Sequence, residues 1–371
     1  MAIATAGVAF AVLLIFMQLG FMNMLFESAV MIHRRLNADI VLVSSTSRDF
    51  ANPGTFPRSR LLQAVGVPGV ADAEALYVTP REWIKQSETN RGERAQMLMI
   101  GVGPDFAAFR DPEIAAQLPL LVETGTALFD RKTRGNFIPF RQAIERGERP
   151  QTELGGRTVT LVGTMQIGSS FGSEGVLIVS DQTFFEFALN RVPSAPSVGL
   201  VNVVPNHDAA EVASAIRARF GAYDDTMVMT MEDFIEHSKG RMRRDSAISF
   251  VFTFGTIIGM IVGVVIVLEI LSADVHDHLA EYATFKAMGF SNRALLGVVF
   301  EQSLILSVAG FVPGLLVSLG LYAVVRSALT MPIAMTAERL VLVFGLAVTM
   351  CALSGALAMR RVRKADPADV F

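Results

Sequence analysis

The sequence is poor in charge and has almost no cysteine. Of its 371 residues, 18% are charged and 51% are hydrophobic, and the mean hydropathy is +0.45. A soluble domain usually has about 25% charged residues. This composition therefore argues against a fully soluble enzyme and against a disordered chain. The single cysteine, Cys351, excludes an intrachain disulfide and a cysteine-based metal cluster. With a net charge of −3, the protein has no overall positive potential that would attract nucleic acid.

The few charges are also unevenly distributed along the chain. Residues 1–26 contain no Asp, Glu, Lys or Arg, and residues 247–371 contain 16 of them. Residues 27–246 carry 51, about 23% of that segment, which is ordinary for a globular domain. This division predicts a transmembrane helix at residues 1–26, a water-soluble domain at 27–246 and further transmembrane helices within 247–371.

Four nearly uncharged runs occupy the two ends of the chain: residues 1–26, 246–268, 294–325 and 340–359. Each is long enough for the roughly 20 residues that cross a hydrocarbon core of ~30 Å. Backbone groups in lipid must be satisfied within their own segment, so each run predicts a helix. The first run could instead be a cleaved signal peptide, but it lacks a positive n-region, and we favour a retained helix.

Basic residues in the short connections predict the orientation. The loop after the second span and the C-terminal tail share one side of the membrane, and the short loop 326–339 lies on the other. The first side carries Lys286, Arg293, Arg360, Arg361, Arg363 and Lys364, and the second carries Arg326 and Arg339. Positive residues in short segments favour the cytoplasm. We therefore expect both termini in the cytoplasm and residues 27–246 on the opposite, extracytoplasmic side of an inner membrane.

The middle domain combines strand and helix patterns. Apolar runs predict strands at residues 39–44, 76–79, 96–102, 156–163, 199–204 and 225–230. Residues 209–220 have helical apolar spacing, and Asp208 is a plausible N-cap. The fold class is thus a membrane α-helical protein with four transmembrane helices and a large α+β domain between helices 1 and 2. Residues 231–244 predict a stalk helix leading into the second span, or an ordinary solvated helix end.

Small residues recur at four-residue spacing within the predicted spans. They lie on one face of each helix and allow close backbone approach, either within one chain or across a dimer. The residues are Gly255, Gly259, Gly263, Gly310 and Gly314. Pro313 should kink the third span. Glu301 is either a functional ionisable group within that span or an interfacial residue.

Motifs of enzymatic and nucleotide-binding sites are missing. The chain has no HExxH, GxSxG, CxxC or GxxxxGK[ST] sequence. His276 and His278 are two residues apart and point to different helix faces, and a solvated polar loop is the favoured interpretation of the acidic residues around them. We expect no catalytic residue, no metal and no cofactor in this chain.

Four segments resemble one transporter family. Residues 278–291, HLAEYATFKAMGFS, resemble the E-Y-A-T-L-K-A-M-G-F signature of FtsX-like ABC permeases, most closely the DevC subgroup. Residues 360–371, RRVRKADPADVF, resemble the R-(x)n-D-P-A-E-V-F terminus of these permeases. Residues 6–21 resemble the subgroup's first span, and residues 36–42 resemble the strand that follows it. The resemblance covers essentially the whole chain.

The resemblance implies a permease subunit that dimerises and binds two copies of a separate ATPase, which holds the ATP. It implies a cytoplasmic coupling helix at about residues 279–290, with contacts from Glu281, Tyr282, Phe285, Lys286, Met288 and Gly289. MacB-type systems of this family relay ATPase motion through the stalk to the periplasmic domain. DevC-like systems also engage a periplasmic adaptor and a TolC-like outer-membrane channel, and membrane lipids surround the spans.

Two other functions stay open within the same family: an FtsX-type signalling permease that regulates periplasmic hydrolases, and a lipoprotein-release permease. The exported substrate is undetermined. Ala280 stands where many relatives carry Arg, which would weaken one contact of the coupling helix. Many relatives also have a basic helix before the first span, so we expect the true N-terminus upstream of Met1.

Overall fold

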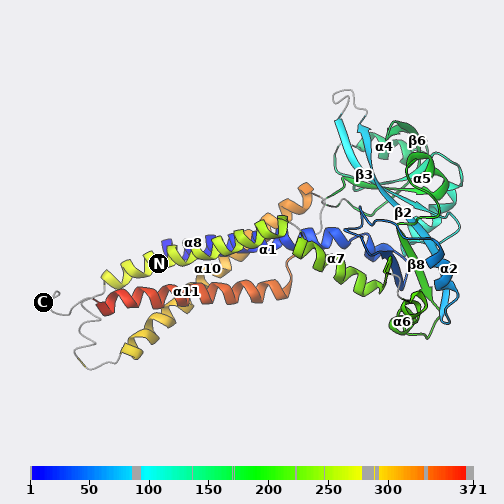
Figure 1. Ribbon diagram of the computed structural model, residues 1–371. Coiled ribbons are helices and arrows are strands. Elements are labelled where there is room, and N and C mark those ends of the chain that lie inside the picture. Colours follow the sequence, from blue (N-terminus) through cyan, green and yellow to red (C-terminus); the bar gives the residue numbers. More distant parts are fainter. Residues whose placement is uncertain are drawn as a thin grey trace. The chain divides into compact units, whose positions relative to one another are not determined.

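The protein forms two compact units (Figure 1). The computed structural model describes residues 2–85, 93–135, 137–168, 170, 172–221, 224–245, 247–277, 288, 292–329 and 333–364. Unit 1 comprises Met1–Met24, Ser246–Ala328 and Pro332–Phe371, and unit 2 comprises Leu25–Asp245 and Leu329–Met331. Each unit is considered by itself below.

Unit 1 is helical. Its described helices are α1 (Ala2–Val30), α8 (Ala247–Asp277), α10 (Asn292–Leu329) and α11 (Ala337–Lys364). The described chain has four segments long and apolar enough to cross a membrane: Ile3–Val30, Ser249–Ala273, Phe300–Ser327 and Ala337–Ala358. The prediction of four transmembrane helices is therefore confirmed. Pro313 lies inside α10.

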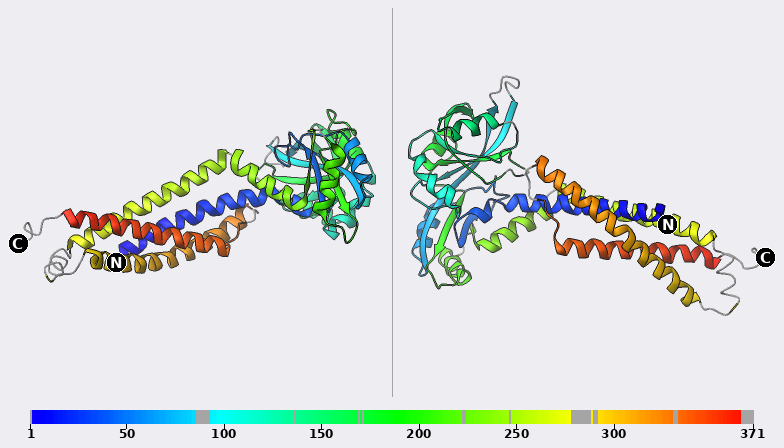
Figure 2. Two further views of the ribbon diagram at one scale, coloured as in Figure 1. Left: turned by 60° about the horizontal axis from the view of Figure 1, so that its bottom comes forward. Right: turned by 180° about the vertical axis from the view of Figure 1, so that it is seen from behind.

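Helix α1 occupies the interior of unit 1, with α8, α10 and α11 running alongside it (Figure 2). Five apolar side chains of the part of α1 in unit 1 are completely buried: Val8, Ala11, Val12, Ile15 and Phe16. The outward faces of α8 and α10 instead expose large apolar side chains, including Phe250, Ile261 and Leu316. An apolar exterior of this kind suits contact with lipid, which offers no hydrogen bonds.

Glycines of α10 allow the close approach of α1. A Cβ at Gly310 would lie 2.5 Å from Val8 Cβ, and a Cβ at Gly314 would lie 2.8 Å from the carbonyl oxygen of Ala9. Real Cβ atoms do not approach other atoms so closely, so only glycine fits at these two positions without movement. At Gly20 the glycine belongs to α1 instead, and the absence of a side chain there makes room for the Tyr322 hydroxyl of α10.

The glycines of α8 also face neighbouring helices of the same chain. Gly263 lies against Ala11 of α1 and Met350 of α11, and Gly255 lies against the Gln18 side chain of α1. Gly259 makes ordinary contacts with Leu14 and Ile15 of α1. The small faces that the sequence predicts for helix packing therefore have partners within one chain.

Unit 2 mixes strands with short helices. Its described strands are β1 (Ile40–Ser44), β2 (Val70–Lys85), β3 (Glu93–Val102), β4 (Thr126–Asp130), β5 (Gln151–Leu154), β6 (Arg157–Met165), β7 (Gly175–Ser180), β8 (Val198–Val203) and β9 (Thr226–Thr230). Its described helices are η1 (His33–Arg35), α2 (Ser59–Val65), α3 (Pro112–Gln117), η2 (Leu118–Val122), α4 (Ile138–Glu145), α5 (Asp181–Phe187), α6 (Ala209–Phe220) and α7 (Met231–Asp245), and α1 contributes its last residues, 25–30.

The strands form two connected sheets. The order is β3-β7-β4-β6-β5-β2-β8-β1-β9, and an additional β2–β3 pairing closes the first six strands into a ring. The long strand β2 joins the two parts, because its second half pairs with β3 and β5 and its first half pairs with β8. Trp83 of β2 is completely buried and makes edge contacts with Phe129, Phe137 and Phe140 at 5.5–5.7 Å between ring centres.

Strand β1 is buried on both faces in the second sheet. Ile40 and Leu42 belong to the core cluster that includes side chains of α2 and α6, and Val41 and Val43 belong to the cluster that includes Phe234 of α7. Burial on both faces explains why the sequence reads as a continuous apolar run rather than an alternating one. The predicted β8–α6–β9 unit is confirmed, and Asp208 caps α6 by accepting from the Ala210 backbone N–H at 3.1 Å.

The sequence interpretation missed several elements of unit 2. Strands β4 and β7 and helices α2, α4 and α5 were not predicted, although the predicted strands at 39–44, 96–102, 156–163 and 225–230 are confirmed within three residues. Short helices without a full apolar stripe carry too few periodic positions to be recognised. The predicted stalk helix is α7, which ends at Asp245.

His33 is an uncharged histidine in the core of unit 2. Its ring lies 4.4 Å from the Phe234 ring and 5.0 Å from the Phe50 ring, and its Nε2 is 3.1 Å from Ser238 Oγ. The ring is 1% exposed, and burial lowers its pKa from 6.5 to about 3. Protonation of His33 therefore opposes folding.

We expect two glycine substitutions in α10 to change the stability of the protein in opposite directions. Gly310→Ala places a methyl group against Val8 and should cost about 1–3 kcal/mol through overpacking. Gly320→Ala is the matched control, because nothing lies within 4 Å of its Cβ position, and it should be neutral or slightly stabilising. Thermal unfolding in detergent measures both. Equal midpoints for the two variants would contradict the packing of α10 against α1.

Stability should fall as the pH falls from about 6.5 to about 3, because the unfolded chain binds a proton at His33 that the folded chain rejects. The loss amounts to at most about 5 kcal/mol, given 1.36 kcal/mol for each unit of pKa difference. His33→Leu should flatten the dependence of the unfolding midpoint on pH across this window. His207→Leu, at an exposed histidine, is the control and should keep the slope of the wild type.

Candidate functional site

The end of α1 and the helix α7 are joined by charged and aromatic contacts, which we call the α1–α7 clamp. Glu27 of α1 accepts from Lys239 of α7 at 3.0 Å and from Arg34 at 3.0 Å. The Lys239 side chain is 18% exposed and that of Glu27 is 29% exposed, so the pair is partly shielded from water. Shielding makes the pair stronger than an ordinary surface ion pair.

Two further contacts complete the α1–α7 clamp. The Arg243 guanidinium of α7 lies 5.5 Å from the centre of the Phe26 ring, a cation–π distance. His33 follows α1 and meets Ser238 of α7. Burial, and then the charges of Arg241 and Arg244, lower the pKa of the neighbouring His237. The clamp therefore combines an ion pair, a cation–π contact and a buried polar contact between the same two segments.

A polar cluster joins α1, α10 and α11 within unit 1. The Tyr322 hydroxyl of α10 donates to the Phe16 carbonyl of α1, and Arg339 of α11 donates to Tyr322 at 3.4 Å and to the Ala334 carbonyl at 2.8 Å. Arg339 is 7% exposed. Sequence reasoning counted it only as a loop charge, because nothing local shows that a tyrosine 17 residues earlier faces it.

The predicted coupling segment falls mostly outside the described residues. This applies to Glu281, Tyr282, Phe285, Lys286 and Gly289. Met288 is described, lies in a turn and is 62% exposed. The segment connects the end of α8 at Asp277 with the start of α10 at Asn292. Its role in coupling therefore stays a prediction from sequence.

A metal site would need several of the His, Cys, Asp and Glu side chains in the described part of the chain to lie together. Within that part, no group of three or more His, Cys, Asp or Glu side chains could hold a metal ion. Glu301 lies on an exposed face of α10. The five glycines that were singled out from the sequence are positions of helix packing within unit 1.

Two family comparisons together span almost the whole chain. Residues 1–219 match the family described as "MacB-like periplasmic core domain", and residues 253–367 match "FtsX-like permease C-terminal". The first match covers α1 and most of unit 2, and the second covers α8, α10 and α11. No curated protein sequence matches this chain.

Two solved structures are similar to part of this chain. The extracellular domain of the noncanonic ABC-type transporter YknZ from Gram-positive bacteria has 14% identity and a TM-score of 0.33, over 52% of this chain and 100% of that one. The periplasmic region of MacB from Actinobacillus actinomycetemcomitans has 10% identity and a TM-score of 0.35, over 56% of this chain and 94% of that one. The family matches, which cover more than half of the sequence, decide the classification. This chain belongs to the MacB/FtsX-like permease family of ABC transporters.

Proposed function

We propose that this chain is the permease subunit of a DevC-like ABC exporter in the bacterial inner membrane. A separate ATPase would bind it from the cytoplasm, and an adaptor and a TolC-like outer-membrane channel would receive the exported molecule. Permeases of this family work with an ABC ATPase and often with an adaptor and a channel. The observation that carries the proposal is the sequence of residues 278–291 between α8 and α10, within a chain of this family.

Residues 279–290 would form the helix that contacts the ATPase. Tyr282, Phe285 and Met288 offer apolar side chains for a groove, and Glu281 and Lys286 offer polar contacts at its rim. Met288, the one residue of this set that the structure describes, is exposed and so is accessible to a partner. The connection joins two transmembrane helices directly, so a force on it would reach both α8 and α10.

The packing within each unit supports a mechanical role for α1. At Gly310 and Gly314 the α10 backbone packs directly against Val8, Val12 and Ala9 of α1, so a displacement of α10 would move α1. Helix α1 is continuous from Ala2 to Val30, and Glu27 near its end is held by Lys239 of α7. In the proposed mechanism, ATP-driven movement of the membrane helices reaches the periplasmic domain through α1 and the α1–α7 clamp. The functional unit would be a homodimer with two ATPases.

The coupling segment is tested with the double substitution Phe285→Asp/Gly289→Arg. A charge in the apolar contact and a long side chain at the glycine should abolish co-purification of the ATPase encoded beside this permease. Affinity capture of the tagged permease, followed by quantification of the ATPase, gives the result. Thr336→Asp adds a charge at an exposed residue just before α11, outside the membrane-spanning segments, and is a control for general disturbance of the membrane unit.

If the double variant retained full ATPase binding, residues 279–290 would not be the coupling helix. Capture of a periplasmic hydrolase or a lipoprotein chaperone, in place of an adaptor, would contradict export and favour one of the two other family functions.

The α1–α7 clamp is tested by charge exchange. Glu27→Lys and Lys239→Glu each place like charges together, and each should lower adaptor-stimulated ATPase activity of the assembled complex by roughly fivefold, a coupling effect of ordinary size. The double exchange Glu27→Lys/Lys239→Glu restores opposite charges between α1 and α7 and should recover part of the activity, because a lysine at position 27 would still repel Arg34. Glu236→Lys is the matched control, because Glu236 is 70% exposed and lies 3.8 Å from the same lysine. Full activity in both single variants would show that the clamp transmits nothing.

A further inference from the structure

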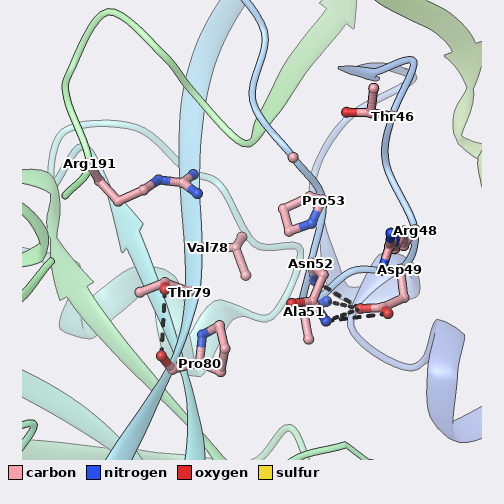
Figure 3. Close-up of a pocket in the computed structure, with 11 residues that line it drawn as sticks. Thr46, Arg48, Asp49, Ala51, Asn52, Pro53, Val78, Thr79, Pro80 and Arg191 are labelled. Atoms are coloured by element: carbon pink, nitrogen blue, oxygen red, sulfur yellow. Dashed lines mark hydrogen bonds between the residues drawn. The ribbon is translucent and has the colours of Figure 1, made fainter.

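Unit 2 contains a cavity of about 540 Å³ that neither the coupling segment nor the α1–α7 clamp uses. It lies between the loop after β1, the middle of β2 and the loop after α5 (Figure 3). Its wall includes Arg48, Pro53, Val78, Pro80 and Arg191. Cavities of about 300–1,000 Å³ are the usual size for small-molecule ligands.

The Arg191 guanidinium points into this cavity (Figure 3). Its Nη2 donates to Ser197 Oγ, which also accepts from the Val78 backbone N–H at 2.9 Å, so the guanidinium is fixed over the middle of β2. Its buried Nε has no hydrogen-bond partner in the described part of the chain. The described part of the protein therefore provides hydrogen-bond acceptors for only some of the N–H groups of this guanidinium.

The cavity has an excess of positive charge. Arg191, Arg48 and the nearby Arg81 make no ion pair with any described residue, whereas Arg35, Arg60 and Arg131 of the same unit each pair with a carboxylate. Burial, and then the charge of Arg81, lower the pKa of Arg191. Arg81 lies outside the cavity wall, where its Nε donates to the Phe187 carbonyl, and an anion in the cavity beside Arg191 would offset the repulsion between the two guanidinium groups.

Asp49, the one carboxylate in the cavity wall, is bound to its own loop. Its Oδ1 accepts from the backbone N–H groups of Ala51 at 2.9 Å and Asn52 at 2.8 Å. The same carboxylate accepts from the Asn52 side-chain amide at 3.2 Å, and Figure 3 shows these bonds turned away from Arg191. Asp49 therefore shapes the loop and leaves Arg191 without a negative partner.

The loops around the cavity are held in place before any ligand arrives. The Tyr77 hydroxyl donates to the Pro193 carbonyl at 2.8 Å, and the Arg58 N–H donates to the Ser194 carbonyl at 2.9 Å. On the other wall, Gly54 has a φ of +67°, and a side chain there would press on Ser44 and Thr46. Walls that are already ordered lose little entropy on binding.

We propose that this cavity is a binding site for a small organic oxyanion, whose carboxylate, phosphate or sulfate group pairs with Arg191. Arg48 contributes a second positive charge at the wall. The exposed Pro80 and the partly exposed Ala51 present apolar surface in the cavity wall, so the ligand carries a short apolar body next to its charged head. A planar guanidinium binds two oxygens of such a group at once. The site is independent of ATPase binding and of the proposed export function.

The test uses the full chain in a non-ionic detergent, without the ATPase. Calorimetric titrations with 4-phenylbutyrate and with phenyl phosphate should each show one saturable site, and the neutral 4-phenylbutanol should bind at least tenfold more weakly. Comparison of the two anions identifies the preferred head group. Arg191→Gln should weaken anion binding by at least tenfold, whereas Arg157→Gln, at an exposed arginine of β6, should leave it unchanged.

A second variant fills the space without removing the charge. Thr46 is an exposed residue of the cavity wall, and Thr46→Trp should abolish binding while the unfolding midpoint stays near that of the wild type. This variant decides the question if Arg191→Gln fails to fold. The proposal is wrong if neither anion binds saturably, or if Thr46→Trp binds both as the wild type does. Arg191-dependent binding of hexaglutamate without binding of the small anions would also overturn it and indicate a protein segment as the occupant.

Discussion

The close contact of α1 with α10 is the interaction on which the membrane unit depends. At Gly310 and Gly314, α10 contributes no side chain, so Val8, Val12 and the Ala9 backbone of α1 pack directly against the α10 backbone. Lipid offers no hydrophobic gain for bringing helices together, so association in a membrane relies on such contact. Gly20, facing Tyr322, extends the contact and allows the tyrosine to reach the Phe16 carbonyl.

The structure shows contacts of the first span that its sequence does not indicate. Residues 1–26 contain no charge at all and read only as a membrane anchor. In the structure the same helix extends to Val30, and its final turns provide Phe26 and Glu27 for contacts with α7. One helix therefore carries both the packing contacts of unit 1 and the charged contacts of unit 2. This arrangement underlies the proposal that α1 transmits movement.

Candidate site residues were recognised from sequence only where the signal was local. Small residues four apart are visible in a sequence, and so is a family signature such as residues 278–291. The ion pair of Glu27 with Lys239 joins residues more than 200 positions apart, and the contact of Arg339 with Tyr322 depends on how two helices face each other. The Arg191 cavity is assembled from three separate segments, none of which carries a motif.

By itself, the sequence determined four spans, their order around a soluble α+β domain, the β8–α6–β9 unit and the permease family. These features follow from run length, periodicity and capping, which act between residues close in the chain. Tertiary structure decided the closure of six strands through the β2–β3 pairing, the central place of α1, the burial of His33 and the unpaired charge of Arg191. Such features depend on which distant segments pack together and exclude water. Local sequence patterns do not indicate which segments these are.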